Sequence, residues 1–383
     1  MPADPHTTLP TTLRTPLHTA LPTALPTDLH IGGRPTAAKD RFPVHDPATG
    51  AVLAEVADGG AEDALRAVAA AHEAGPGWAA TPPRRRSELL LAAFDLMRGQ
   101  AEELAALITA ESGKALSDAR AEVRYAAEFF RWYAEEAVRA AGSLATAPSG
   151  GHRLLVQYRP VGVCALVTPW NFPAAMATRK LAPALAAGCT TVLKPASDTP
   201  LTALYVAALL ERAGVPPGVV NVVPARRPTA VVPALLADPR VRKLSFTGST
   251  EVGRALLRTA ADRVVNASME LGGNAPFLVF ADADLDAAVD GAMVAKMRNA
   301  GQACTAANRF YVQAPVAAEF GHRLAERMAA LTVGHGAAPG TDVGPLINRA
   351  AADKADRLVR AAVGGGGGAG GPGRPPPPAP GGC

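Results

Sequence analysis

Between Val161 and Ala261 the sequence alternates between short apolar runs and segments with helical spacing, separated by loops. We expect strands at residues 161–167, 190–193, 219–223 and 243–246, and helices at 176–187, 201–213, 231–236 and 252–261. Strands that alternate with helices in this way form a parallel sheet covered on both faces. Ligands of such sheets bind at the carboxyl ends of the strands. The pattern therefore predicts an α/β fold with a Rossmann-type dinucleotide domain.

The segments on either side of this region carry weaker signals. An extended start is expected around residues 31–33 and 46–50, followed by helices near residues 62–74, 85–112 and 117–141, because alanine and leucine recur there at helical spacing. Apolar residues of the second helix form a stripe that we interpret as core: Leu89, Ala93, Leu96 and Met97. Residues 151–159 alternate like an edge strand. A second α/β unit begins near Ala275, with a strand at 277–280 and a helix at 284–297.

The composition limits the class of protein. With 383 residues, 48% hydrophobic, the chain can bury a sizeable core. Its net charge of +4 comes from scattered arginines rather than a basic stripe, so nucleic acid is not an expected partner. No apolar run approaches the roughly 18 residues of a membrane span, and no secretory signal is present, so we predict a cytoplasmic protein without a membrane partner.

The four cysteines have neither metal-ligand nor disulfide-framework spacing, which favours a reducing compartment and predicts no metal site. We expect Cys164 and Cys189 to be inert core residues. Residues 1–28 form a leader rich in proline and threonine, expected to be unfolded, although a targeting role stays open. Residues 364–383 are almost entirely glycine and proline, which form neither a helix nor a paired strand.

The candidate catalytic residues are a cysteine and an acid. Cys304 lies in Asn299-Ala-Gly-Gln-Ala-Cys-Thr, and Glu270 lies upstream in Met-Glu-Leu-Gly-Gly-Asn. A thiolate can add to a carbonyl carbon and hold the acyl group as a thioester, and a carboxylate can activate the water that releases it. Each residue alone has an ordinary interpretation, since a single cysteine is often a small buried hydrophobe and Glu-Gly-Gly is often a turn.

Three further motifs accompany this pair: Thr168-Pro-Trp-Asn-Phe-Pro, Lys194-Pro-Ala-Ser and Phe246-Thr-Gly-Ser-Thr-Glu-Val-Gly. With them the chain resembles the NAD(P)-dependent aldehyde dehydrogenase superfamily, and within it the succinate-semialdehyde dehydrogenases, over about residues 29–363. The resemblance implies an aldehyde dehydrogenase-like fold in two units. Residues 29–274 would form the dinucleotide-binding domain, with an oligomerisation ribbon at 146–160, and residues 275–363 would form a partial catalytic domain.

The resemblance assigns the catalytic steps. Cys304 attacks the aldehyde carbon, the side chain of Asn171 and the backbone N–H of Cys304 stabilise the resulting oxyanion, and Glu270 activates water to hydrolyse the thioester. Gly272 and Gly273 suggest that the backbone after Glu270 is mobile or closely approached by a neighbour. The family often has a second cysteine two residues after the nucleophile. Here that residue is Ala306, so a disulfide switch at this place is not expected.

The resemblance also assigns the cofactor site. Lys194 matches the residue that contacts the adenosine ribose, and Ser197 stands where a glutamate would repel a 2′-phosphate, so we predict NADP, with NAD as the alternative. The full set of cofactor residues is Thr168, Pro169, Trp170, Lys194, Ser197, Gly248, Ser249, Gly253 and Leu271. Arg226 and Arg227 either meet the 2′-phosphate or are exposed charges, and we favour the second interpretation.

Two arginines indicate the substrate. Arg179 and Arg298 match the residues that hold the far carboxylate in succinate-semialdehyde dehydrogenases, and an arginine fork can bond both oxygens of a carboxylate. The leading interpretation is oxidation of succinate semialdehyde to succinate. Either arginine could instead pair with an acid such as Asp286 in a structural role. The alternatives are therefore a dehydrogenase of another small aldehyde, or an inactive fragment that still binds dinucleotide.

Family members continue beyond the segment at Gly364 with further pocket residues and a Glu-x-Phe-Gly-Pro motif. If that segment is absent, we expect exposed apolar faces, poor solubility and low activity. The resemblance implies a homo-oligomer for the full-length family and leaves the association of this chain open.

Overall fold

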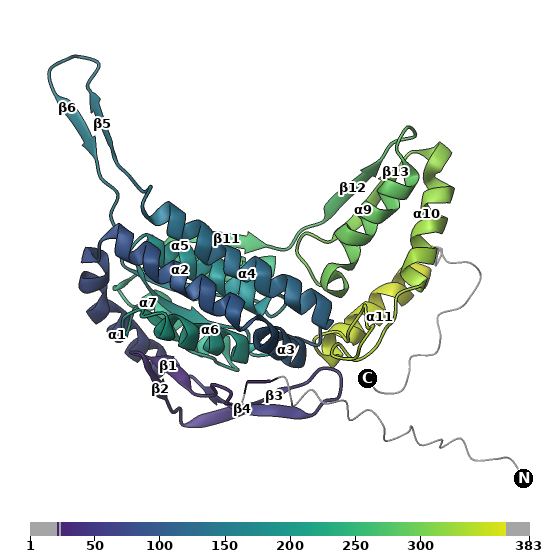
Figure 1. Ribbon diagram of the computed structural model, residues 1–383, viewed down its shortest axis with the longest axis horizontal. Helices are drawn as coiled ribbons and strands as arrows, with labels where there is room; N and C mark the ends of the chain where they lie inside the picture. Colours follow the sequence, from purple (N-terminus) through teal and green to yellow (C-terminus); the bar gives the residue numbers. More distant parts are fainter. Residues whose placement is uncertain (1–20, 23, 365–383) are drawn as a thin grey trace, which may run out of the picture.

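The main body is a seven-stranded sheet covered by helices, from which a hairpin and a smaller α/β unit project (Figure 1). The computed structural model describes residues 21, 22 and 24–364. The other residues of the predicted leader, and residues 365–383 of the predicted tail with Cys383, lie outside this part.

Five parallel strands form the centre of the sheet, in the order β11-β10-β7-β8-β9, and two short antiparallel strands extend it at one edge. The parallel strands are β7 (Val163–Val167), β8 (Thr190–Lys194), β9 (Val220–Val222), β10 (Val241–Gly248) and β11 (Asn266–Leu271). The edge strands are β1 (Leu29–Ile31) and β2 (Arg34–Thr36). Every residue of β7 and β8 is buried, as expected for apolar strands with helices on both faces. The predicted α/β class is confirmed.

The two faces of the sheet bury different helices. Cys164 and Leu166 pack with α2 (Pro83–Gly99), α3 (Ala101–Ser112), α4 (Leu116–Ala137), α5 (Pro173–Ala186) and α6 (Pro200–Arg212). Their neighbours Val163, Ala165 and Val167 point to the other face, toward α1 (Ala61–Ala80), α7 (Pro228–Ala237) and α8 (Thr250–Ala261). This alternation follows from the two-residue period of a strand. It also buries Cys164, as predicted.

Several predicted boundaries are wrong. The single helix expected at 85–112 is broken at Gln100, which follows Gly99 and has non-helical backbone angles. The helix expected to end at residue 74 continues to Ala80 through Gly75 and Pro76, because Trp78 in its last turn is buried in the core. The extended start contains two further strands, β3 (Asp40–His45) and β4 (Val52–Asp58), which pair antiparallel across the turn at 46–50.

Two buried glutamates hold the helices that follow β7 and β8. Glu122 of α4 accepts hydrogen bonds from the backbone N–H groups of Ala174 and Ala175 at the start of α5, at 2.9 and 3.2 Å. Glu111 of α3 does the same at the start of α6, with Leu201 and Thr202 at 2.9 and 3.0 Å. The first N–H groups of a helix have no partner inside the helix, so the carboxyl group of each glutamate satisfies two of them.

We expect Glu111→Gln to reduce the pH dependence of stability. Burial raises the pKa of Glu111 from 4.5 to about 8. The folded state therefore keeps a proton that the unfolded chain has released, so this group stabilises the fold fully below pH 4.5 and loses its effect as the pH rises through about 8. Glutamine stays neutral across this window and keeps the acceptor oxygen.

Denaturant unfolding at about pH 5 and about pH 8 measures this effect. Between these pH values the wild-type chain should lose more free energy of unfolding than Glu111→Gln, by on the order of a few kcal/mol. The control is Glu73→Gln, which changes an exposed glutamate of α1 and should behave as wild type. Identical pH profiles for wild type and Glu111→Gln would show that the carboxyl group of Glu111 titrates normally.

The smaller unit has its own core. Strands β12 (Ala275–Val279) and β13 (Ala307–Val312) pair in parallel and pack with α9 (Leu285–Met297) and α10 (Ala314–Ala329) around Phe277, Phe310 and Phe320. The last element described is α11 (Arg349–Gly364). Leu278, Phe280 and Tyr311 each expose more than half of their surface, so this small sheet has one apolar face open to solvent.

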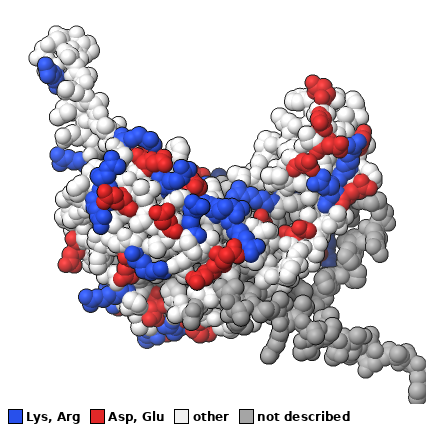
Figure 2. Space-filling model, viewed as in Figure 1, with Lys and Arg blue, Asp and Glu red and all other residues white. Residues whose placement is uncertain are grey.

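The hairpin of β5 (Ser143–Thr146) and β6 (Arg153–Val156) extends away from the body. All eight strand residues are exposed, including Leu144 and Leu155, and the arm carries few charges (Figure 2). Elsewhere on this face both signs of charge are intermixed. Within the described part of the chain, no helix is both long and apolar enough to cross a membrane. The oligomerisation role of residues 146–160 and the cytoplasmic compartment stay predictions.

Candidate active site

The loops that carry the predicted cofactor residues meet at the carboxyl edge of the parallel strands. The backbone N–H of Thr168, after β7, donates to the carbonyl of Lys194 at the end of β8, at 3.2 Å. The Thr199 hydroxyl, in the loop after β8, lies 3.5 Å from the carbonyl of Trp170. Because β7, β8, β10 and β11 run in parallel, Gly248 and Leu271 end at the same edge.

The edge has features that suit a dinucleotide. Lys194 is buried, and burial lowers the pKa of its ammonium group to about 8, although Asp198 and Asp58 oppose this shift. Helix α8 begins directly after β10, capped by Ser249, and a helix N-terminus attracts phosphate. Gly253 in its first turn lets the helix lie against Leu271, because an added Cβ would come within 2.6 Å of the leucine side chain.

Ser197 lines a small cavity of about 200 Å³ together with Arg226, His45 and Asn348. The backbone N–H of Arg226 is fixed by the carboxylate of Asp58, at 2.8 Å. Arg226 therefore lies beside Ser197 at the wall of this cavity. Arg226 and Arg227 are both exposed, as the favoured interpretation expects, and a contact of Arg226 with a 2′-phosphate stays the alternative.

The segment that leads to Cys304 begins with an unusual turn. After α9 the chain forms a short 3-10 helix at Arg298–Gly301, in which Asn299, Ala300 and Gly301 have φ of 53°, 53° and 76°. Such left-handed angles cost energy for alanine, so the surroundings must hold the turn. The backbone N–H of Asn299 donates to Asp118 of α4 at 3.0 Å, and its side chain donates to the carbonyl of Asn171 at 2.8 Å.

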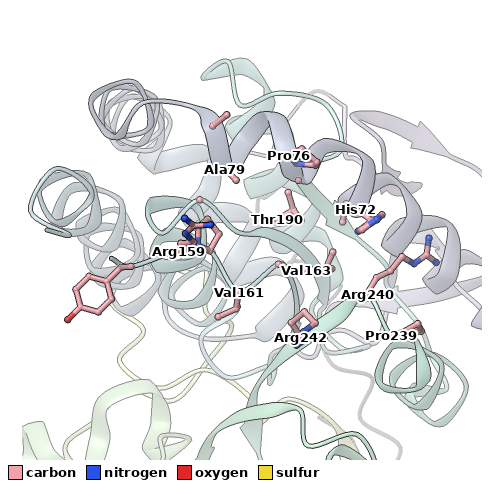
Figure 3. Close-up of a pocket in the computed structure, with 17 residues that line it drawn as sticks. His72, Pro76, Ala79, Arg159, Val161, Val163, Thr190, Pro239, Arg240 and Arg242 are labelled. Carbon is pink, nitrogen blue, oxygen red and sulfur yellow. The ribbon is translucent and has the colours of Figure 1, made fainter. Parts of the chain in front are cut away.

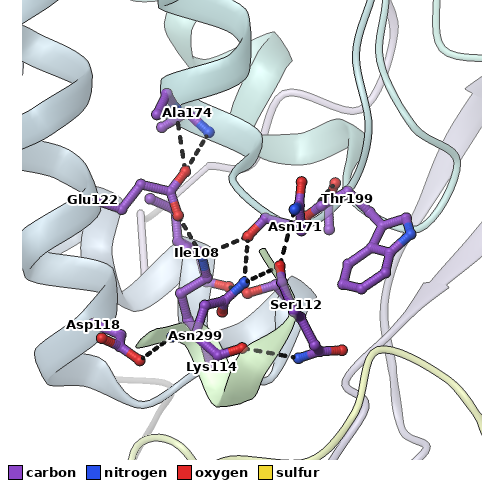
Figure 4. A network of polar contacts seen from close by, with 12 residues as sticks. Ile108, Ser112, Lys114, Asp118, Glu122, Asn171, Ala174, Thr199 and Asn299 are labelled. Carbon is purple, nitrogen blue, oxygen red and sulfur yellow. Dashed lines mark hydrogen bonds and ion pairs between the residues drawn. The ribbon is translucent and has the colours of Figure 1, made fainter. Parts of the chain in front are cut away.

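Asn171 is the centre of a buried polar network (Figure 4). The Lys114 ammonium donates to the Asn171 carbonyl at 2.8 Å and to Glu122 at 2.5 Å, and both charged side chains are almost completely buried. The Asn171 side-chain amide donates to the carbonyl of Gln302 at 2.9 Å. An amide carries two N–H donors, and among the described residues this bond uses one of them. The network joins the loop after β7 to the segment of Cys304.

Of the three cysteines that the structure describes, Cys304 alone is exposed, whereas Cys164 and Cys189 are buried. Glu270 is also exposed and lies on β11, paired with Thr247 of β10. No hydrogen bond joins Cys304 and Glu270 within the described residues, so their cooperation stays a prediction. An added Cβ at Gly272 or Gly273 meets no atom within 4 Å, so no neighbour approaches the backbone closely at these positions.

Lys180 belongs to the site but was given no role from the sequence. Its ammonium donates to the Ser245 hydroxyl of β10 at 2.9 Å. Burial lowers the pKa of Lys180 to about 8, and the nearby carboxylate of Glu270 opposes this shift. The available signal is a lysine beside Arg179 in a helix whose other residues, apart from Thr178, are apolar.

The two predicted substrate arginines meet at one aromatic ring. The Arg179 guanidinium donates to the Tyr125 hydroxyl, and its carbon lies 5.8 Å from the centre of that ring. The Arg298 guanidinium lies 5.4 Å from the same ring and 5.0 Å from Phe172. Among the described residues, neither arginine forms an ion pair. Asp286 pairs with Arg323 instead, at 2.6 Å, so the structural alternative that named Asp286 is wrong.

A cavity of about 930 Å³ lies at the opposite, amino edge of the sheet (Figure 3). Val163 and Thr190, at the starts of β7 and β8, line it together with Arg240 and Arg242. None of the predicted site residues contributes to its wall. The large cavity and the predicted active site are therefore different places.

Comparison with known proteins places these observations in a family context. The sequence model described as the aldehyde dehydrogenase family matches residues 35–378. This match extends past Val363, the last residue of the resemblance carried by the motifs. The chain is 55% identical to a succinate-semialdehyde dehydrogenase of Paenarthrobacter nicotinovorans over 312 residues, which are 82% of this chain and 69% of that protein.

Two further proteins with succinate-semialdehyde dehydrogenase names are also similar to this chain. The chain is 51% identical to a probable succinate-semialdehyde dehydrogenase [NADP(+)] of Sinorhizobium fredii, over 85% of this chain and 66% of that protein. The crystal structure of succinate-semialdehyde dehydrogenase from Burkholderia pseudomallei superposes with a TM-score of 0.88 at 46% identity, covering 93% of this chain and 73% of that one. The chain spans about two thirds of the length of the curated relatives that it matches.

Proposed function

Because the chain belongs to the aldehyde dehydrogenase family, we propose that it oxidises succinate semialdehyde to succinate through a thioester on Cys304, with NADP as cofactor. One observation carries the substrate assignment: Arg179 and Arg298 converge on Tyr125, and neither forms an ion pair among the described residues. A pair of guanidinium groups of this kind suits the far carboxylate of a semialdehyde.

In this mechanism Cys304 attacks the aldehyde carbon as the thiolate, which is the nucleophilic form. The free N–H of the Asn171 amide donates to the oxyanion that forms. The hydrogen bonds from Lys114 and Asn299 to the Asn171 carbonyl keep this residue in place beside the nucleophile segment. When bound, NADP supplies the hydride acceptor that the oxidation requires, and Lys194, Ser197 and the N-terminus of α8 would hold it.

Hydrolysis of the thioester requires a base, which we assign to Glu270. The carboxylate takes a proton from water as the water attacks the acyl carbon, and the thiolate of Cys304 leaves. Lys180 is near enough for its charge to interact with Glu270.

A comparison of two four-carbon aldehydes tests the substrate. Succinate semialdehyde should show a kcat/KM at least about tenfold above that of butanal, because hydrogen bonds to a charged group contribute about 1.5–3 kcal/mol each. Equal values for the two aldehydes would assign the chain to another small aldehyde and leave the arginines without this role.

We expect Ser197→Glu to reverse the cofactor preference. The wild-type chain should bind NADP more tightly than NAD, and the substitution should change the ratio of the two dissociation constants at least about tenfold toward NAD, because a carboxylate repels the 2′-phosphate. Fluorescence titration with both dinucleotides measures the ratio. Ser197→Gln adds similar bulk without charge and should keep the wild-type order. An unchanged ratio in Ser197→Glu would place the 2′-phosphate elsewhere.

A further inference from the structure

Arg179 and Arg298 carry like charges and no carboxylate within the described residues pairs with either, yet both face the ring of Tyr125. Like charges repel, so neighbouring groups must offset the repulsion between the two guanidinium groups. The carboxylate of Asp118 interacts with the charge of Arg298, and the ring of Tyr125 is the group that faces both arginines. We propose that Tyr125 is a specificity-determining residue, which positions both arginines for the far carboxylate of the substrate. The proposal rests on the function proposed above and names a residue of the same site.

Tyr125 contacts the arginines in two ways. Its hydroxyl accepts a hydrogen bond from Arg179, which fixes the direction of that side chain. Its ring lies 5.4 Å from the Arg298 guanidinium carbon and 5.8 Å from that of Arg179, within the range of cation–π attraction. Phe129, one helical turn later, packs edge-on against Tyr125, with the two ring centres 5.0 Å apart. The guanidinium carbon of Arg179 lies 5.2 Å from the centre of the Phe129 ring.

Helix α4 connects Tyr125 to both segments that carry the arginines. On the side of Arg179, Glu122 of α4 binds the start of α5, the helix to which Arg179 belongs. On the side of Arg298, Asp118 of α4 accepts a hydrogen bond from Asn299, the next residue in the chain. Tyr125 therefore lies on an element that is fixed to both partners, and its position relative to them is set by buried contacts.

An aromatic group serves this purpose better than an acid would. A carboxylate at this position would neutralise the arginines and compete with the carboxylate of the substrate, whereas the ring attracts the cations and leaves their charge available. The hydrogen-bond donors of a guanidinium lie in its plane, so a ring that contacts its face leaves them free, and Arg179 gives only one of its donors to the Tyr125 hydroxyl. Tyr125 should therefore favour ligands with a far carboxylate over uncharged ligands of the same length.

Binding of 4-hydroxybutyrate tests the proposal without requiring turnover. This compound has the far carboxylate and an alcohol in place of the aldehyde. Calorimetric titration of the full chain should show that Tyr125→Phe, which lacks only the hydroxyl, weakens binding about threefold. Tyr125→Leu, which also lacks the ring, should weaken it about tenfold or more. The control Tyr133→Phe changes another tyrosine of α4 and should bind as wild type.

A second pair of measurements separates specificity from folding. In both Tyr125 variants the affinity for NADP and the KM for butanal should stay at wild-type values, while the KM for succinate semialdehyde rises. Equal weakening for charged and uncharged ligands would show a merely structural role and overturn the proposal. Wild-type affinity for 4-hydroxybutyrate in both variants would also overturn it, with the proposed function intact. If the unsubstituted chain binds no 4-hydroxybutyrate and does not prefer succinate semialdehyde, the proposed function itself is wrong.

Discussion

Cys304→Ala should lower kcat for aldehyde oxidation by about 10⁴-fold or more, because removing a covalent nucleophile abolishes the main reaction path. Cys304 is exposed beside the network of Asn171, whereas Cys164 and Cys189 are buried among apolar side chains of the sheet and its helices. Formation of NADPH from saturating succinate semialdehyde and NADP measures the loss. The affinity of the variant for NADP should be unchanged, since Cys304 has no assigned role in binding the dinucleotide.

The matched control is Cys383→Ala, which removes a cysteine outside the described residues and should keep full activity. Cys164→Ala and Cys189→Ala are less suitable as controls, because both residues pack in the core and their loss would leave small cavities. Activity in Cys304→Ala within tenfold of wild type would contradict a thioester mechanism at this residue.

The double substitution Arg179→Gln with Arg298→Gln should lower kcat/KM for succinate semialdehyde by about 10²–10⁴-fold. Each arginine is expected to donate to the substrate carboxylate, and each charged hydrogen bond contributes about 1.5–3 kcal/mol. The value for butanal should change little, because butanal has no carboxylate to bind. The selectivity between the two aldehydes, rather than the absolute rate, therefore reports the role of the arginines.

Arg323→Gln is the control for this experiment. Arg323 lies on α10 of the smaller unit and pairs with Asp286 and Glu319 at the surface. Its loss should leave the selectivity unchanged. An equal fall for both aldehydes in the double variant would indicate that the arginines support the fold. Preserved selectivity would show that another group binds the carboxylate.

The central sheet could be predicted because its signal is local. The run Val-Cys-Ala-Leu-Val of β7 and the run Thr-Thr-Val-Leu-Lys of β8 are buried throughout, and each is followed by a helix whose first residue is proline. By contrast, β11 alternates between exposed and half-buried residues at an edge of the sheet, and its strand character was missed although it carries Glu270. Strand pairing with β10, which is not local, decides its conformation.

The residues that hold the site together could not be predicted from the sequence. Lys114, Glu122 and Tyr125 lie about 50 residues before Asn171 and Arg179, and nothing in the local pattern indicates which distant backbone groups they meet. Glu122 and Tyr125 stand in an amphipathic helix where polar residues are normally solvated. Motifs identified the residues expected to contact ligands, whereas only the fold revealed the buried polar groups that position them.

Covalent trapping at Cys304 tests the central claim most directly. The chain is incubated with succinate semialdehyde and NADP, quenched in acid during turnover, digested and analysed by mass spectrometry. We expect a succinyl group on the peptide that contains Cys304, which hydroxylamine releases and which does not form without NADP. Turnover with a succinyl group on Cys164 or Cys189 instead, or with no cysteine modified in a quench fast enough to capture the intermediate, would contradict it.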